Sequence, residues 1–243
     1  MKIVLLLLIG VILSAGNIKI AVAANVSYAI EDLKAEFNTL YPDIKVQVTL
    51  GSSGKLTAQI KNGAPYQLFM SANMRYPKSL YADKIAITKP KVYAQGGLAF
   101  LSSKKRDFSK GINLLKDKKI SKIAIANPKT APYGKATLEA LTNAKIYNDI
   151  KSKIVYGESI SQTLTFTLRA TDIGIVAKSL LFSPRMAKFK KGINWSELDS
   201  SLYTPISQGI VMLKDNRDVE LFYNFILSQK AKKILKNFGY IVE

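Results

Sequence analysis

Strand-like and helix-like stretches alternate from residue 18 onward, and this alternation restricts the fold more than any other feature. Residues 18–23, 44–50 and 68–70 are apolar or alternate with a period of two, which predicts three strands. Alternating strands and helices are typical of a parallel sheet covered by helices, and ligands bind beyond the carboxyl ends of such strands. Between the first two strands, apolar residues recur with helical period at Val26, Ile30, Leu33, Phe37 and Leu40.

A second series of the same kind follows in the middle of the chain. A further strand and two closing helices complete it, so the layout predicts two α/β lobes with a cleft between them. The strands expected here are residues 98–101, 123–126, 154–156, 173–176 and 209–213, with helices at 135–141 and 160–169.

Two residue types that carry much of enzyme chemistry are absent. The chain has no Cys, which excludes disulfides and a thiolate nucleophile, and no His, which excludes a Ser-His-Asp triad and His-ligated zinc or iron. The formal net charge of +19 comes from scattered Lys residues without aromatic interleaving. We interpret this charge as a solvated coat and expect no nucleic-acid partner.

The N-terminus has the three parts of a secretory signal peptide. Met1-Lys2 precedes the apolar residues 3–13 and then Ser14-Ala15-Gly16, and cleavage after Gly16 would place small residues at both recognition positions, Ser14 and Gly16. The apolar run is short for a membrane span, and the absence of Cys excludes a lipoprotein anchor. We therefore expect residues 1–16 to be removed and the mature protein to be exported and soluble.

Four strand–turn–helix junctions share one design. Each presents backbone N–H groups at the positive end of a helix dipole, and three add a hydroxyl or an amide side chain. Ordinary helix capping explains any one of them. Four together, two in each lobe, favour a site where neutral donors from both sides hold a compact dianion. The junctions are Ala24-Asn25, Ser52-Ser53 in Gly51-Ser52-Ser53-Gly54, Pro132-Tyr133 and Ser159-Ile160.

The chain resembles the periplasmic molybdate-binding proteins, the solute receptors of molybdate ABC importers, over nearly its whole mature length. The resemblance implies an α/β fold of type II periplasmic-binding-protein class: two lobes, each a mostly parallel sheet flanked by helices, with the ligand in the interlobe cleft. Residues 17–94 with 208–243 would form one lobe and residues 95–207 the other. The similar motifs are AVAAN (21–25), GSSGKL (51–56), GAPYQLFMSAN (63–73), ANPKTAPYG (126–134), GIV (174–176) and FGY (238–240).

The resemblance also implies which residues hold the oxyanion. Asn25 would donate from its backbone and side chain, and Ser53 from its hydroxyl and backbone. Tyr133 and Ile160 would each donate a backbone N–H from the second lobe, and Ala24 is a candidate fifth contact through its backbone. The metal would be bound as an oxyanion, with no direct protein–metal ligand and no cofactor.

Three positions depart from the family pattern. Ala177 follows Gly-Ile-Val where some members place a ligand-contacting Tyr, so the chain is more similar to the branch without that Tyr. Gln67 and Asn73 stand where relatives usually have acidic residues. These two changes affect lobe-to-lobe or supporting contacts rather than the anion contacts.

The expected function is that of a periplasmic, monomeric, non-enzymatic receptor that binds molybdate, and tungstate as well, and delivers it to an ABC permease. One alternative is a receptor of the same fold for sulfate, ferric ion or an organic acid. The other is a secreted serine hydrolase. Since the chain lacks His, such an enzyme would need Lys55 as the base for Ser52 or Ser53.

Overall fold

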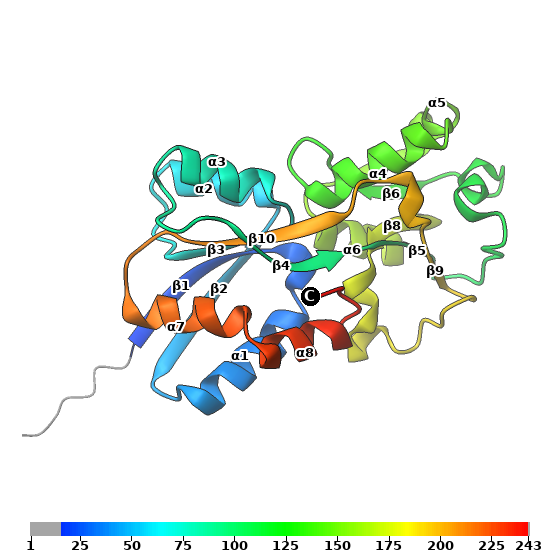
Figure 1. Cartoon of the computed structure of the whole chain (residues 1–243). Helices are drawn as coiled ribbons and strands as arrows, with labels where there is room; N and C mark the ends of the chain where they lie inside the picture. The colour runs from blue at the N-terminus through cyan, green and yellow to red at the C-terminus, as the bar shows by residue number, and fades with distance from the viewer. Residues whose placement is uncertain (1–15, 243) are drawn as a thin grey trace, which may run out of the picture.

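The computed structural model describes residues 16–242, which form two five-stranded sheets flanked by helices (Figure 1). The predicted signal peptide, residues 1–16, lies outside the described residues except for Gly16, the first residue of β1. The first sheet contains β1 (Gly16–Ala23), β2 (Ile44–Gly51), β3 (Leu68–Ser71), β4 (Lys91–Gly96) and β10 (Ile206–Met212). The second contains β5 (Leu98–Leu101), β6 (Ile123–Ala126), β7 (Ile154–Gly157), β8 (Ile173–Ala177) and β9 (Trp195–Glu197).

Eight α-helices and several short 3-10 turns accompany these strands in residues 16–242. With the first sheet go α1 (Ala29–Leu40), α2 (Ser53–Lys61), α3 (Arg75–Ala82), α7 (Arg217–Ile226) and α8 (Gln229–Asn237). With the second go α4 (Pro132–Asn143), α5 (Tyr147–Ile150) and α6 (Ile160–Arg169). The 3-10 turns are η1 (Ala24–Val26), η2 (Gly111–Lys116), η3 (Lys151–Lys153), η4 (Lys178–Phe182), η5 (Pro184–Met186) and η6 (Ser200–Leu202).

Both sheets are mixed. The first has the order β2-β1-β3-β10-β4, in which β1 is parallel to β2 and β3, and β10 is antiparallel to β3 and β4. The second has the order β7-β6-β8-β5-β9, in which β6 is parallel to its neighbours and β5 is antiparallel to its own. The two-lobed α/β fold is confirmed. Half of the pairings in each sheet are antiparallel because one strand of each enters from the other lobe.

The chain passes between the sheets along β4 and β10. Strand β4 ends at Gly96 and β5 begins at Leu98, so a single residue separates the two sheets there. Strand β10 then returns from the second lobe and pairs with β4 from Ile206 onward. The predicted lobe boundaries, 94/95 and 207/208, fall inside these two paired strands. The crossing spans two or three residues, and within that span the exact boundaries stay predictions.

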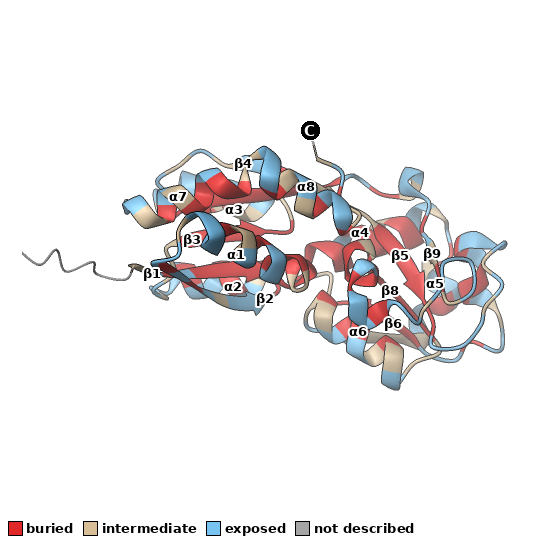
Figure 2. Ribbon diagram, turned by 90° about the horizontal axis from the view of Figure 1, so that it is seen from below, coloured by how far each residue is buried: buried red, intermediate tan, exposed pale blue. Residues whose placement is uncertain are grey.

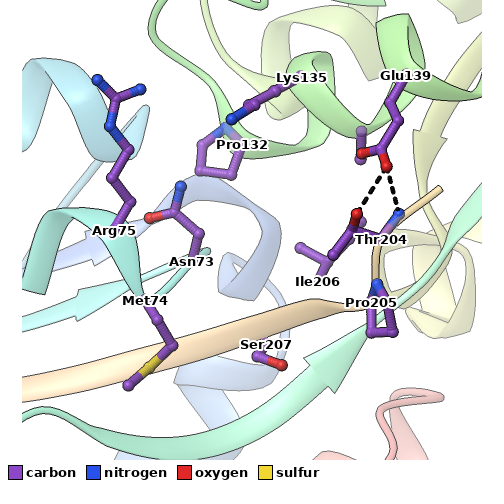
Figure 3. A pocket seen from close by; sticks show the side chains of 11 residues that line it. Asn73, Met74, Arg75, Pro132, Lys135, Glu139, Thr204, Pro205, Ile206 and Ser207 are labelled. Carbon is purple, nitrogen blue, oxygen red and sulfur yellow. Dashed lines mark hydrogen bonds between the residues drawn. The ribbon is translucent and has the colours of Figure 1, made fainter. Parts of the chain in front are cut away.

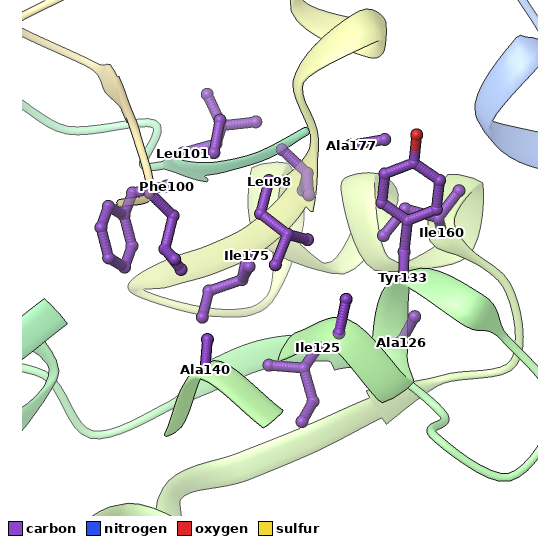
Figure 4. Close-up of a cluster of buried hydrophobic side chains, with 14 of the residues drawn as sticks. Leu98, Phe100, Leu101, Ile125, Ala126, Tyr133, Ala140, Ile160, Ile175 and Ala177 are labelled. Atoms are coloured by element: carbon purple, nitrogen blue, oxygen red, sulfur yellow. The ribbon is translucent and has the colours of Figure 1, made fainter. Parts of the chain in front are cut away.

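Each sheet carries its own apolar core (Figure 2). Alternate residues of a strand point to opposite faces. Ile20 of β1 accordingly packs with Phe37 of α1 and Phe222 of α7, whereas Ala21 packs with Leu56 of α2. In the second lobe one cluster joins α4 and α6 to the strands (Figure 4). Both cores lie directly behind the strand ends that face the other lobe, so they hold those ends rigidly.

The helix starts differ from the predicted ones at three junctions. The helix after Gly51-Ser52-Ser53-Gly54 is expected to open at Lys55-Leu56, and α2 begins two residues earlier, at Ser53. Helix α4 begins at Pro132, three residues before the predicted range 135–141. No long helix begins at Asn25, because η1 forms first and α1 starts only at Ala29. Helix α6 begins at Ile160 as predicted. The sequence interpretation also missed α3, β4, α5 and β9, which are short or carry few apolar residues.

None of the helices described in residues 16–242 is both long and apolar enough to cross a membrane.

Candidate functional site

A small cavity lies where the carboxyl ends of β1, β2 and β6 meet the starts of α2, α4 and α6. Its volume is about 10 Å³. Pockets for drug-sized ligands usually measure about 300–1,000 Å³, so this cavity has room for a ligand of a few atoms at most. Its lining residues carry no formal charge. They are Ala23, Ala24, Asn25, Gly51, Ser52, Ser53, Ala72, Ala131, Pro132, Tyr133 and Ile160.

All five sequence-predicted site residues therefore line one cavity, and all four junctions contribute to it. Sequence alone could not show this meeting. Whether these residues bind an anion is a separate question, and their assignment as ligand donors stays a prediction.

Three helix starts direct backbone N–H groups at the cavity. Ser53 and Ile160 are the first residues of α2 and α6, and Tyr133 is the second residue of α4. The first N–H groups of a helix have no partner within the helix, and they carry the positive end of its dipole. At the fourth junction Asn25 lies in η1, which has only three residues and therefore contributes little dipole. The cavity thus receives donors from both lobes without a charged side chain.

The two serines differ in their hydrogen bonds. The Ser53 hydroxyl is fully buried and accepts a hydrogen bond from the Ala72 N–H at 2.9 Å, which leaves its own hydrogen free to donate. The Ser52 hydroxyl is buried and has no partner among the described residues. Neither hydroxyl serves as a conventional cap, since α2 has no side-chain cap hydrogen bond. Both hydroxyl hydrogens are therefore free, and Ser53 is the residue predicted to donate to a ligand.

Asn25 is held by a network that sequence reasoning missed. Its Nδ2 donates to Gln208 Oε1 at 2.7 Å and to Tyr240 Oη at 2.8 Å, and its Oδ1 is buried without a partner. The Asn25 carbonyl accepts from Tyr240 Oη and from Ser179 Oγ, both at 3.0 Å. In this arrangement both amide hydrogens of Asn25 are engaged by protein. The predicted side-chain donation to a ligand therefore needs a different orientation of that amide.

Gln208 links this network to the second lobe. Its Oε1 also accepts from Tyr93 Oη at 2.9 Å, and its Nε2 donates to Tyr133 Oη at 3.1 Å. Gln208 is fully buried on β10. A Gln beside the apolar residues of a predicted strand could have indicated this network from the sequence, because a polar group that becomes buried needs hydrogen-bond partners.

The tyrosines around the network are neutral at physiological pH. Burial raises the pKa of Tyr240 to about 12, and burial likewise raises the pKa of Tyr93 and of Tyr133 well above the usual tyrosine value. Each phenol can therefore act as donor or acceptor without adding charge beside the cavity.

Direct contacts join the two lobes around the cavity. The Gly54 N–H donates to the Thr130 carbonyl at 2.9 Å, and Ser161 Oγ donates to the Ala24 carbonyl at 3.0 Å. At the rim, Lys55 Nζ lies 2.6 Å from a Glu158 carboxylate oxygen. No hydrogen bond between Lys55 and either serine exists in the described residues. The lobes thus touch around the cavity, and Lys55 at its rim is paired with an acid.

A second, larger groove lies between the lobes beside this cavity (Figure 3). Its volume is about 270 Å³, and Arg75 and Lys135 line opposite walls. Asn73 also lines it, and its Oδ1 accepts from Ser71 Oγ and from the Tyr76 N–H, both at 3.3 Å. Asn73 therefore makes local supporting contacts and none across the lobes.

The other two departures from the family pattern, Gln67 and Ala177, do not line the cavity. Gln67 Oε1 accepts from the Lys19 N–H at 2.9 Å, which ties the start of β3 to β1. Ala177 ends β8 and is fully buried within the core of the second lobe (Figure 4). No cluster of three or more acidic side chains that could hold a metal ion occurs in the described part of the chain.

Comparison with known proteins agrees with this geometry. The family model for bacterial extracellular solute-binding proteins matches residues 18–241. The molybdate-binding protein ModA of Azotobacter vinelandii is 32% identical over 93% of this chain and 90% of its own length. ModA of Rhodobacter capsulatus is also 32% identical, over 95% of this chain and 90% of its own length.

A solved structure extends the comparison to the fold. The periplasmic molybdate-binding protein of Azotobacter vinelandii superposes with a TM-score of 0.85 at 30% identity, covering 93% of this chain and 99% of that one. The region matched by the family model, residues 18–241, includes all four junctions. The chain belongs to the bacterial extracellular solute-binding protein family.

Proposed function

We propose that this protein is an exported receptor that binds molybdate, and tungstate as well, in the cavity between its lobes. The observation that carries the proposal is the meeting of three helix starts and the Ser53 hydroxyl in one small cavity whose lining carries no formal charge. The named ligand of its similar relatives supports the same choice.

Neutral donors suit a dianion that must later be released. Each helix start carries roughly half a positive charge, so three of them offset most of the ligand's charge. Burying full charges instead would cost several kcal/mol per ion in desolvation. We assign Ser53 as hydroxyl and backbone donor, Tyr133 and Ile160 as backbone donors, and Asn25 and Ala24 as donors from η1.

Selectivity would follow from fixed geometry. The donors lie on rigid elements, and the lobes already touch around the cavity, so the distance between opposing donors is set. Molybdate and tungstate are nearly equal in size and charge, and sulfate is smaller. A smaller anion would leave several donors at non-bonding distance, and each buried donor left unpaired costs about 1–3 kcal/mol.

The proposal is tested by isothermal titration calorimetry with sodium molybdate, tungstate, sulfate and phosphate. We expect tight, similar binding of the first two and binding weaker by at least roughly 100-fold for the others. Equal affinity for sulfate would contradict the proposal and favour the alternative of a sulfate receptor. Tight ferric-ion binding would favour the other alternative ligand, although the cavity lining holds none of the acidic ligands that iron sites prefer.

The receptor would act as a periplasmic monomer that passes its ligand to an ABC permease. Sedimentation velocity checks the monomeric state, and molybdate uptake by cells with and without the receptor checks delivery. The rival hydrolase is tested by labelling with a serine-reactive fluorophosphonate. We expect no labelling of Ser52 or Ser53, because Lys55 is paired with Glu158 rather than with either hydroxyl.

A further inference from the structure

Gln208 and Asn25 form a pair of buried amides between the cavity and β10, one of the two strands along which the chain passes between the lobes. Gln208 lies on β10 at the point where its register with β4 shifts, between Gln208 and Gly209. Asn25 lines the cavity. The two amides meet at 2.7 Å, from Asn25 Nδ2 to Gln208 Oε1. One end of the Asn25 amide thus faces Gln208 and Tyr240, and only the Oδ1 end is left for a ligand.

An Oδ1 atom is the wrong group for a dianion. A fully deprotonated oxyanion only accepts hydrogen bonds, and Oδ1 only accepts them too. Without a ligand this atom is buried and unpaired, which is itself costly. A ligand would therefore bind better if the amide turned so that Nδ2 took this position.

Turning Asn25 alone would place its oxygen against the Gln208 oxygen, but turning both amides keeps each contact between the side chains. Gln208 Nε2 would then donate to Asn25 Oδ1 and to Tyr93 Oη, and Gln208 Oε1 would accept from Tyr133 Oη. Tyr240 Oη would donate its one hydrogen to Asn25 Oδ1 and would give up its bond to the Asn25 carbonyl. The Asn25 carbonyl would keep its bond from Ser179 Oγ.

Two arrangements of hydrogens therefore fit the same heavy atoms. The contacts concerned are those of Gln208 with Asn25, Tyr93 and Tyr133, and that of Tyr240 with Asn25. All three phenols can reverse between donor and acceptor, since burial keeps them protonated by raising the pKa of each. The first arrangement leaves an unpaired acceptor, and the second leaves an N–H donor in its place.

We propose that Gln208 is the positioning residue of the anion site and that oxyanion binding turns the Gln208 and Asn25 amides over together. Gln208 acts through Asn25 and does not touch the ligand. The same turn reverses the hydrogen bond between Gln208 and Tyr133, so the ligand in the cavity sets the contact between β10 and the second lobe. This inference rests on the proposed oxyanion function.

The turn is observed directly in the side-chain amide resonances of ¹⁵N-labelled protein, before and after addition of sodium molybdate. We expect the Gln208 and Asn25 resonances to shift together, because the NH2 group of each amide donates to different acceptors after the turn. Gln95 on β4 is the matched control, since its Nε2 lies 3.4 Å from Ser207 Oγ and does not line the cavity. Spectra of Gln208→Met and Gln95→Met assign the two signals. A shifted Asn25 signal with an unchanged Gln208 signal would overturn the proposal.

Affinity for molybdate gives a second, independent readout. Gln208→Glu accepts at both ends while it is ionised, so it holds Asn25 Nδ2 away from the cavity, and we expect roughly 100-fold weaker binding together with a lower melting temperature, because a buried carboxylate costs stability. Gln208→Met neither donates nor accepts, and we expect about tenfold weaker binding. Gln95→Met should bind within about twofold of wild type.

These outcomes separate the possible causes. If the charge of Gln208→Glu alone weakened binding, Gln208→Met would bind as wild type does, and that result would overturn the proposal. Should Gln208→Glu fail to fold, Gln208→Met and the wild-type spectra still decide. Wild-type protein that does not bind molybdate at all would refute the proposed function, whereas wild-type binding without a Gln208 shift refutes only this inference.

Discussion

Lys55 Nζ and a Glu158 carboxylate oxygen lie 2.6 Å apart across the rim of the cleft, one from each lobe. Lys55 is in the first turn of α2, and Glu158 precedes α6. Both side chains are 52% exposed, so solvent screens their attraction. The pair exists only while the lobes are closed, and it therefore favours the closed form without touching the ligand.

Removing this pair should weaken molybdate binding slightly. We expect Lys55→Met and Glu158→Gln each to lower affinity by at most about fivefold, because exposed ion pairs contribute little. Calorimetry at low and high salt checks this, and the difference from wild type should shrink as salt rises. Lys34→Met is the matched control, since Lys34 pairs with Glu31 inside α1. A loss of 100-fold would mean that Lys55 contacts the anion.

The same pair predicts a dependence on acid. The hydrogen bond from Lys55, and then that from Asn127, lower the pKa of Glu158 below its usual value. A carboxylate with a lowered pKa contributes fully above its unperturbed pKa of about 4.3, and the contribution is lost as pH falls through the lowered pKa. The difference in affinity between wild type and Glu158→Gln should therefore be constant from pH 8 to pH 5 and be lost only as pH falls below the unperturbed pKa.

The strand-to-helix junctions were predictable because their signals are local. Ser159 followed by the apolar period from Ile160 predicted the start of α6, and the structure has the Ser159 hydroxyl accepting from the Gln162 N–H at 3.2 Å. The rule that ligands bind at the carboxyl ends of strands then placed the junctions at one edge. Local signals also explain the errors, since no apolar period marks Ser53 or Pro132 as helical.

Contacts between distant residues were not predictable. Asn25 and Gln208 are 183 residues apart, and only the return of β10 beside β4 brings them together. The antiparallel pairing of β10 and β5 with their neighbours was not predictable for the same reason. It depends on where the chain crosses between the lobes and not on any local pattern. The network that orients Asn25 therefore needed the fold.

Ser53→Ala tests the predicted hydroxyl donor. The Ser53 hydroxyl accepts from the Ala72 N–H, so its hydrogen is free for the ligand, and removing it should weaken molybdate binding by about 1–3 kcal/mol. Ser52→Ala removes a buried hydroxyl without a protein partner. We expect it to leave affinity unchanged and stability unchanged or slightly higher. Calorimetry on both variants decides, and a loss confined to Ser52→Ala would move the donor from Ser53 to Ser52.

Gly96→Ala tests the close approach of the end of β4 to Tyr133. A Cβ atom at Gly96 would collide with Tyr133 Oη and would lie 2.8 Å from Gln208 Nε2. We expect destabilisation by about 1–3 kcal/mol together with weaker ligand binding, because the phenol and the amide must both move. Urea denaturation measures the first effect and calorimetry the second.

The neighbouring glycine is a matched control. A Cβ atom at Gly97 meets nothing closer than Tyr203 Oη at 3.7 Å, which is ordinary contact. Gly97→Ala should therefore change the free energy of unfolding by less than about 1 kcal/mol. Equal effects of the two substitutions would show that the crossing at Gly96 and Gly97 needs backbone freedom. The space required by the Tyr133 side chain would then not explain the need for glycine at position 96.

Tyr240 should make the protein sensitive to alkali. Burial raises its pKa to about 12 from an ordinary value near 10. A group whose pKa is higher in the folded than in the unfolded protein contributes its full stabilisation of the fold below its unfolded-state pKa. This contribution is lost as the pH rises through the folded-state pKa. Two pKa units correspond to about 3 kcal/mol, which should disappear between pH 10 and pH 12.

Tyr240→Phe isolates this contribution, because the ring stays in place and the ionisable group is removed. The free energy of unfolding of wild type minus that of Tyr240→Phe should be constant up to about pH 10 and then fall towards pH 12. Tyr81→Phe, at a side chain that is 39% exposed, controls for the loss of a surface phenol. A difference that stayed flat up to pH 12 would mean that the Tyr240 phenolate is tolerated. The hydrogen bonds between Tyr240 and Asn25 would then not require a neutral phenol.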